Sequence, residues 1–125
     1  MKFENITERI IGCAIRVHRR LGPGLLESTY ENCLAYEMER DGLRVERQKA
    51  IPLIYDGVRM SCGYRVDLLV NDTVVVEVKS VERLEPVHIA QGITYAKLTG
   101  RPVALVINFN VMLLKDGIRR LEVPP

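Results

Sequence analysis

The chain has 125 residues, of which 47% are hydrophobic and 27% are charged, and its formal net charge is +2 at pH 7. This length suits one folded domain with a hydrophobic core and leaves no room for two. The small net charge excludes a strongly basic or acidic protein, so a polyanionic partner would have to be bound by a local cluster of basic residues.

Two helices are predicted at the start of the chain. Residues 5–22 carry apolar side chains at helical spacing, and Gly22 suits the position just after a helix. Pro23 fits the first turn of a second helix, over roughly 23–41, which ends before Gly42. The apolar stripes are Ile6, Ile10, Ala14, Val17 and Leu21 in the first helix and Leu26, Tyr30, Cys33, Leu34 and Met38 in the second.

Short extended segments follow the second helix. Residues 51–62 are predicted to form a β-hairpin, because two apolar runs flank the turn signal Asp56-Gly57. Two further strands are predicted over 64–70 (YRVDLLV) and 74–80 (VVVEVKS). The second contains four β-branched valines, and a short polar loop separates it from the first.

The last third of the chain combines a helix with three strands. Residues 85–100 (EPVHIAQGITYAKLTG) are predicted to be helical, with proline near the start and glycine at the end. The run over 102–109 (PVALVINF) is apolar on both faces, which predicts a fully buried strand. Residues 111–122 are expected to form a closing hairpin that turns at Asp116-Gly117.

This order of elements predicts an α/β (α+β) fold in a single domain over residues 1–125. A strand, a helix and a second strand joined by short connections normally place the two strands parallel. The hairpins are antiparallel, so we expect a mixed β-sheet flanked by helices. The predicted order is two helices, three core strands, a helix, a strand and a C-terminal hairpin.

Three features indicate a cytoplasmic location without a membrane segment. The N-terminal stretch MKFENITERI turns polar at once and lacks the apolar core of a signal peptide. No apolar run approaches the roughly 20 residues that span a bilayer. Cys13, Cys33 and Cys62 are widely spaced and odd in number, which suits reduced thiols better than a disulfide framework.

An acidic pair is the first candidate site. If residues 71–73 form a three-residue loop, Asp67 lies directly opposite Glu77, with the Cβ atoms about 5 Å apart on one face of the sheet. A two-residue loop would instead place Asp67 opposite Val76 and separate the acids, so the site depends on the length of this loop. The same spacing also suits an ordinary half-exposed sheet face, in which charged and apolar residues alternate.

A cation would stabilise this acidic pair, because two carboxylates so close repel each other. Lys79 lies on the same face as Glu77 and supplies one positive charge. Carboxylate oxygens favour Mg²⁺, Mn²⁺ or Ca²⁺ over zinc, and no histidine–cysteine cluster competes. In the second helix, Glu27 is the candidate third carboxylate and Glu31 is its rival one turn later. Alone, Glu27 would be an ordinary acid in the first turn of a helix.

The third helix carries two polar residues on one face. Gln91 and Tyr95 are four positions apart, so their side chains are neighbours on the helix surface. Beside the sheet they could hydrogen-bond to a metal-bound water or to a phosphate. Elsewhere they would be ordinary packing and surface residues.

The acidic pair and the lysine form a pattern that resembles a known family. Asp67, followed by Glu77-Val78-Lys79, resembles the D…ExK signature of the PD-(D/E)XK nuclease superfamily, which has the restriction-endonuclease-like fold. One departure is that Val66, rather than proline, precedes the aspartate. That position varies in the superfamily, so the resemblance holds without it.

Two further segments strengthen this resemblance. GLLESTY (24–30) matches the GxxExxY motif that names a small family of nucleases in the superfamily. QGITY (91–95) resembles the QxxxY motif of the RecB-type exonuclease branch. Some RecB-type relatives hold an iron–sulfur cluster with four cysteines, which the three cysteines here cannot supply. The resemblance spans roughly residues 5–122, with the three motifs in order on the expected elements.

The resemblance implies a set of metal ligands. Asp67 and Glu77 would bind Mg²⁺ or Mn²⁺. Glu27 would be a direct or water-mediated ligand, and the Val78 carbonyl would be a fourth. The metal would make hydroxide available near neutral pH and polarise the scissile phosphate.

It also implies the residues that act on the substrate. Lys79 would orient or help to deprotonate the attacking water and would stabilise the charge that develops on the phosphate. Gln91 would complete the catalytic set, while Tyr95 and Tyr30 would position phosphate or water. The implied reaction is attack of water on a phosphodiester bond.

We therefore expect a metal-dependent nuclease acting on DNA, or alternatively on RNA. The expected partner is nucleic acid and not a membrane. The sequence is also compatible with a homodimer or with a partner subunit that activity needs. The alternative is a catalytically silent module that binds nucleic acid or protein and retains the nuclease fold. The complete set of motif residues favours the enzyme, because a binding module does not need that set.

Overall fold

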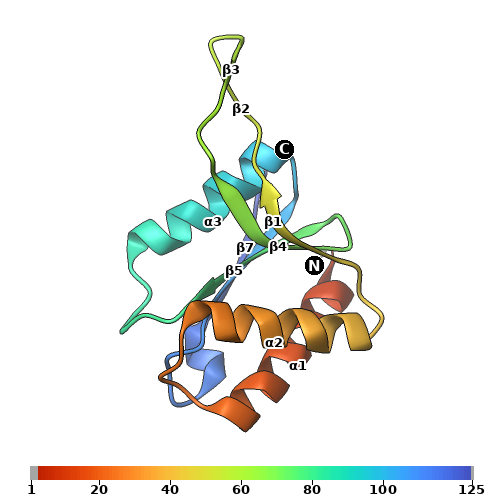
Figure 1. The fold of residues 1–125 in the computed structure, drawn as a ribbon, viewed down its shortest axis with the longest axis vertical. Coiled ribbons are helices and arrows are strands. Elements are labelled where there is room, and N and C mark those ends of the chain that lie inside the picture. Colours follow the sequence, from red (N-terminus) through yellow and green to blue (C-terminus); the bar gives the residue numbers. More distant parts are fainter. Residues whose placement is uncertain (1–2, 125) are drawn as a thin grey trace.

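A mixed five-stranded sheet forms the centre of the molecule, which we describe from a computed structural model over residues 3–124 (Figure 1). Its strands are β1 (Val45–Ala50), β4 (Arg65–Val70), β5 (Val74–Lys79), β6 (Val103–Asn108) and β7 (Ile118–Glu122), in the spatial order β1-β4-β5-β6-β7. β5 and β6 are parallel, and the other neighbours are antiparallel. Two short strands, β2 (Leu53–Tyr55) and β3 (Val58–Met60), form a separate sheet.

Helices cover both faces of the sheet, which confirms the predicted fold class. α1 (Glu4–Leu21) and α2 (Glu27–Arg40) pack on the face that carries Val74, Val76 and Val78 of β5. α3 (Pro86–Thr99) packs on the other face, against Val75. This alternation follows from the period of a strand, in which successive side chains point to opposite faces. Among the described residues, no helix has both the length and the apolar character needed to cross a membrane.

The buried strand β6 and its helix match the sequence-based expectation. α3 ends at Gly100, which has a left-handed backbone, and all six residues of β6 are buried. The step from β5 through α3 to β6 gives parallel strands, as short crossover connections require. The Asp56-Gly57 hairpin also forms, and both turn residues have positive φ.

One expectation about the remaining strands is wrong, and one strand was not predicted. The closing hairpin over 111–122 does not form: residues 114–117 make a 3₁₀ turn (η1, Leu114–Gly117), and β7 pairs with β6. The free edge of β6 offers β7 five ladder pairs, more than a short local hairpin could. β1 is absent from the predicted elements because its sequence, VERQKA, is polar and mostly exposed at the sheet edge.

α2 starts later than predicted, at Glu27 rather than at Pro23. Gly24 has a φ of 100° and Leu26 is extended, so neither can belong to the helix. As a result, Glu27 is the first helical residue and lies at the end of the turn that enters α2.

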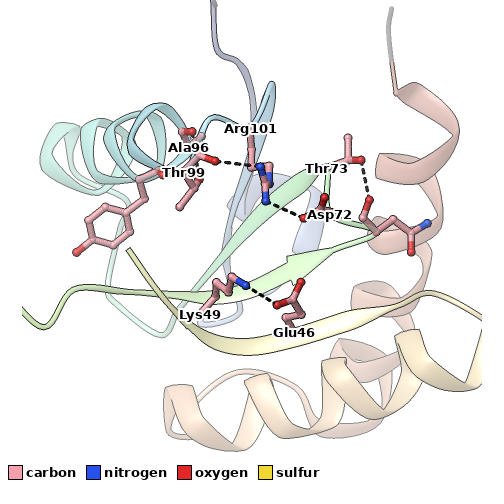
Figure 2. A network of polar contacts seen from close by, with 9 residues as sticks. Glu46, Lys49, Asp72, Thr73, Ala96, Thr99 and Arg101 are labelled. Atoms are coloured by element: carbon pink, nitrogen blue, oxygen red, sulfur yellow. Dashed lines mark hydrogen bonds and ion pairs between the residues drawn. The ribbon is translucent and has the colours of Figure 1, made fainter. Parts of the chain in front are cut away.

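The turn between β4 and β5 sets the register of these strands. Val70 pairs with Val74, so the loop has three residues, which is the length that the candidate acidic site requires. Asn71 and Asp72 have φ values of 50° and 52°, a left-handed conformation that asparagine and aspartate adopt more readily than most residues. Asp72 forms a 2.7 Å ion pair with Arg101, which ties this turn to the loop after α3 (Figure 2).

Candidate active site

Asp67 on β4 and Glu77 on β5 meet where the ladder between these strands stops. The last paired residues are Leu68 and Val76. Beyond them, the Asp67 N–H donates to Glu77 Oε2 at 3.0 Å, and the Val78 N–H donates to Asp67 Oδ2 at 2.8 Å. Carboxyl oxygens thus replace the backbone carbonyls of a regular ladder, and hydrogen bonds from backbone N–H groups hold both side chains against the strands.

Glu77 is a buried carboxyl group, only 2% exposed. Burial, followed by the negative charge of Asp67, raises the pKa of Glu77 to about 8, although the Asp67 N–H and the Lys79 charge act in the opposite direction. The pKa of Asp67 is also raised, chiefly by its own burial. Adjacent acids whose ionisation is disfavoured are typical of functional sites, and a cation would relieve the cost.

A row of polar side chains extends from the end of β5 onto α3. Lys79 Nζ donates to Gln91 Oε1 at 2.6 Å, and Gln91 Nε2 donates to the Tyr95 hydroxyl at 3.0 Å. α3 can approach the sheet closely because a Cβ atom at Gly92 would lie 2.7 Å from Val106. The row therefore brings the lysine of ExK and the QGITY segment together on the α3 face of the sheet.

The two candidate acids of α2 occupy different places. Glu27 is exposed, and its Oε2 accepts a hydrogen bond from the Ser80 N–H at 3.2 Å, just past the end of β5. The Glu31 side chain is 12% exposed, and its charge adds to the effect of burial in raising the pKa of Asp67 and Glu77. Glu31 is thus coupled electrostatically to the acidic pair, whereas Glu27 anchors the segment after β5.

Gln48 on β1 also belongs to this site, and no spacing in the sequence points to it. It stands opposite Asp67, between two regular ladder pairs, but forms none itself. Its φ is 50°, so β1 is distorted at this residue. Its Nε2 donates to Glu31 Oε1 at 2.9 Å and, over a longer distance of 3.4 Å, to Asp67 Oδ1. Gln48 therefore bridges the acid of α2 and the acid of β4.

The acidic pair fits a hard divalent cation. Within residues 3–124, no hydrogen bond reaches Glu77 Oε1, and Asp67 Oδ1 receives only the long one from Gln48. The Val78 carbonyl faces β4 as its N–H does, because both groups of a strand residue point to the same neighbour. Over the same range, no three His, Cys, Asp or Glu side chains are close enough to hold a metal. This set suits Mg²⁺, which retains several waters and needs only one or two carboxylates.

Tyr30 lies in the core, which contradicts the prediction that it positions substrate. The residue is 0% exposed, and its ring stacks on Phe109 with the centroids 4.6 Å apart. Its hydroxyl donates to the Gly22 carbonyl at 2.6 Å and accepts from the Leu25 N–H at 3.1 Å. Tyr30 therefore holds the turn that leads into α2.

Replacing Tyr30 by phenylalanine is expected to lower the free energy of unfolding by about 1–3 kcal/mol, because two backbone groups lose a buried partner while the stacked ring remains. Urea unfolding monitored by circular dichroism would measure the change. Tyr36→Phe, at a residue that is 61% exposed, is the matched control and should unfold like the wild type. Equal stability of the two variants would contradict the supporting role.

Comparison with known protein families finds a match for this chain. A family model described as the PD-(D/E)XK nuclease superfamily matches residues 4–121. Neither a curated protein nor a solved structure matches the chain. The family match extends from α1 into β7 and includes both acids and the lysine. The chain therefore belongs to the PD-(D/E)XK nuclease superfamily.

Proposed function

We propose that this protein uses Mg²⁺ or Mn²⁺ to hydrolyse phosphodiester bonds of DNA, or alternatively of RNA, with water. One observation carries the proposal: Glu77 is buried beside Asp67, on the sheet face that also carries Lys79. Burying a carboxyl group is costly unless a partner compensates for it, and a surface that only binds nucleic acid has no need of that cost. Membership of a nuclease superfamily supports the same class of activity.

The acids and the lysine have separate proposed roles. Asp67, Glu77 and the Val78 carbonyl would hold the metal. The bound ion would supply a water of lowered pKa and polarise the scissile phosphate. Lys79 would orient the attacking water and offset the negative charge that develops on the phosphate. Its position on the face of Glu77 supports this role.

Finer family assignments are part of the same proposal. We assign the chain to the GxxExxY family on residues 24–30, and we relate residues 91–95 to the RecB-type QxxxY motif. Gln91 would then hold Lys79 in position, and Tyr95 would hold Gln91 and contact phosphate or water. Residues 1–125 would form one nuclease-like domain. The cytoplasmic location and the requirement for a homodimer or partner subunit stay predictions.

Cleavage of single- and double-stranded DNA and RNA, with Mg²⁺, with Mn²⁺ and with EDTA, tests the function. We expect metal-dependent cleavage that the Asp67→Ala/Glu77→Ala variant lacks, together with loss of Mn²⁺ binding by calorimetry. Cleavage by this double variant would indicate a contaminating nuclease. Unchanged Mn²⁺ affinity would exclude the proposed metal site. Binding of nucleic acid without cleavage would favour the catalytically silent module.

A pair of isosteric variants decides between the acids of α2. Glu31→Gln is expected to weaken Mn²⁺ binding roughly tenfold, because it removes a negative charge that acts on both metal-binding acids, while the glutamine carbonyl can still accept the hydrogen bond from Gln48. Glu27→Gln, at an exposed position, is expected to change the affinity less. The opposite order, measured by titration calorimetry, would make Glu27 the helical ligand, as the motif resemblance implies.

A further inference from the structure

A two-stranded arm connects β1 to β4 and projects from the sheet (Figure 1). We define the arm as residues 51–64, which contain β2, β3 and the Asp56-Gly57 turn. The backbone hydrogen bond from Ile51 N–H to the Tyr64 carbonyl closes its base at 2.9 Å. Among the described residues, β2 and β3 pair only with each other. An isolated two-stranded hairpin is marginally stable in water, so a surface that covers one face would stabilise the arm.

One face of the arm is apolar and open to solvent. Directly opposed residues share a face, so Tyr55 and Val58 lie together with the pair Leu53 and Met60. Tyr55 is 70% exposed, Val58 is 56% exposed and Met60 is 37% exposed. Apolar side chains grouped in this way on a surface mark an interaction site more often than single exposed ones do.

The base of the arm contacts the row of polar residues in the candidate site. The Tyr64 ring packs at a tilt on the Tyr95 ring, with the centroids 6.0 Å apart. The Tyr95 hydroxyl accepts a hydrogen bond from Gln91, which in turn binds Lys79. A ligand strand that reaches Lys79 therefore lies beside the base of the arm.

The net charge around the arm favours a negatively charged partner. The arm itself holds one basic residue, Arg59, and one acidic residue, Asp56, and the flanking residues 44–50 and 65 add four basic residues and one acidic residue. The segment 44–65 therefore has a formal net charge of +3, whereas the rest of the chain holds 13 basic and 14 acidic residues. Arg59 pairs with Ile54, so it lies on the face of the arm opposite Tyr55. It is exposed, and no side chain within residues 3–124 forms an ion pair with it. Two copies of this positive segment would repel each other, whereas a nucleic-acid backbone complements it.

We propose that the arm binds unpaired nucleotides of the substrate strand, with Tyr55 stacking on a base and Arg59 contacting a phosphate. This inference rests on the proposed nuclease function and names the form of its substrate. Exposed aromatic rings bind base faces, which are free only where the strand is unpaired, and nearby cations follow the backbone. The 51–64 arm would thus guide a single strand toward Lys79.

Fluorescence anisotropy of a labelled oligothymidylate of about 20 nucleotides, in EDTA so that no cleavage occurs, tests the arm. Tyr55→Ser is expected to weaken binding roughly tenfold, and to weaken binding of a matched duplex less. Arg59→Ser is expected to reduce the slope of log affinity against log salt by about 0.7. The matched controls are Tyr36→Ser and Arg19→Ser, at exposed positions on α2 and α1. All four changes are on the surface, so thermal unfolding should match the wild type.

Each outcome separates the arm from the catalytic proposal. Equal affinity of Tyr55→Ser and Tyr36→Ser for the oligothymidylate would overturn the arm proposal while leaving cleavage by the wild type intact. Equal losses on the single strand and the duplex would overturn the preference for unpaired bases. A wild-type dimer that Tyr55→Ser converts to a monomer, with unchanged affinity, would assign the arm to a second copy. Arm-dependent binding without metal-dependent cleavage would overturn the proposed function alone.

Discussion

Replacing Lys79 by alanine is expected to lower the rate of metal-dependent cleavage by roughly 10³-fold. Lys79 Nζ lies on the face of the acidic pair and is fixed by a 2.6 Å hydrogen bond to Gln91, so the substitution removes a held positive charge. A charge positioned in advance acts on the transition state without the cost of reorganisation. Single-turnover cleavage in Mg²⁺ would measure the chemical step directly.

The control for this variant is Lys97→Ala, which removes an exposed lysine from the same helix that holds Gln91. It should cleave at the wild-type rate. Lys79→Ala should still bind Mn²⁺, because Asp67 and Glu77 remain, and this property distinguishes loss of chemistry from loss of the metal. A Lys79→Ala protein that cleaves as fast as Lys97→Ala would exclude the catalytic role.

The sequence predicts the fold correctly where the signals for a helix or strand lie within that element. β-branched residues, buried apolar runs and the proline and glycine at the ends of α3 predict β5, β6 and α3 within a few residues. The prediction of a closing hairpin is wrong because β7 pairs with the open edge of β6 instead of with a local partner. That edge exists only in the folded sheet, so a local sequence pattern does not indicate it. β1 was missed for a related reason, since a polar edge strand carries no hydrophobic period.

The pairing register of β4 and β5 was harder to predict than the strands themselves. The loop 71–73 could be counted as two or three residues, and only the three-residue count placed Asp67 opposite Glu77. The structure has the three-residue count, and the backbone N–H of Asp67 donates a hydrogen bond to the Glu77 carboxyl group. The contact of Gln48 with Asp67 could not be predicted from the sequence, because it depends on a positive φ in an edge strand. The burial of Tyr30 shows that a motif position can support the backbone instead of contacting substrate.

Glu77→Gln is expected to abolish cleavage and, in the absence of metal, to make the protein more stable at pH 7–8. Burial first, and the charge of Asp67 second, raise the pKa of Glu77 to about 8 in the folded state, from an ordinary 4.5. The folded protein therefore holds this proton more tightly than the unfolded chain does. Stability is lost as the pH rises from about 4.5 to about 8 and is constant above that range. At pH 7 the cost is about 3 kcal/mol.

Glutamine has nearly the same shape as glutamate and its carbonyl can still accept the Asp67 N–H, but it cannot ionise. Urea unfolding in EDTA should show similar stabilities for wild type and variant near pH 5, and a growing advantage of the variant up to pH 8. Glu82→Gln, whose side chain is 91% exposed, should follow the wild type at every pH. Identical pH profiles for Glu77→Gln and Glu82→Gln would show that Glu77 carries no such cost.

Adding metal should reverse the order of stability of the wild type and Glu77→Gln. This reversal would connect the cost of burying Glu77 to metal binding. A ligand that binds only the folded state stabilises it in proportion to the logarithm of its concentration over Kd. Mn²⁺ should therefore stabilise the wild type at pH 8 and leave Glu77→Gln nearly unchanged, because the variant lacks one of the two carboxylates of the site. If Mn²⁺ stabilised both proteins equally, Glu77 would not be a metal ligand, and its burial would need a different explanation. A wild-type response alone would identify the ionised Glu77 as the group whose cost the metal offsets.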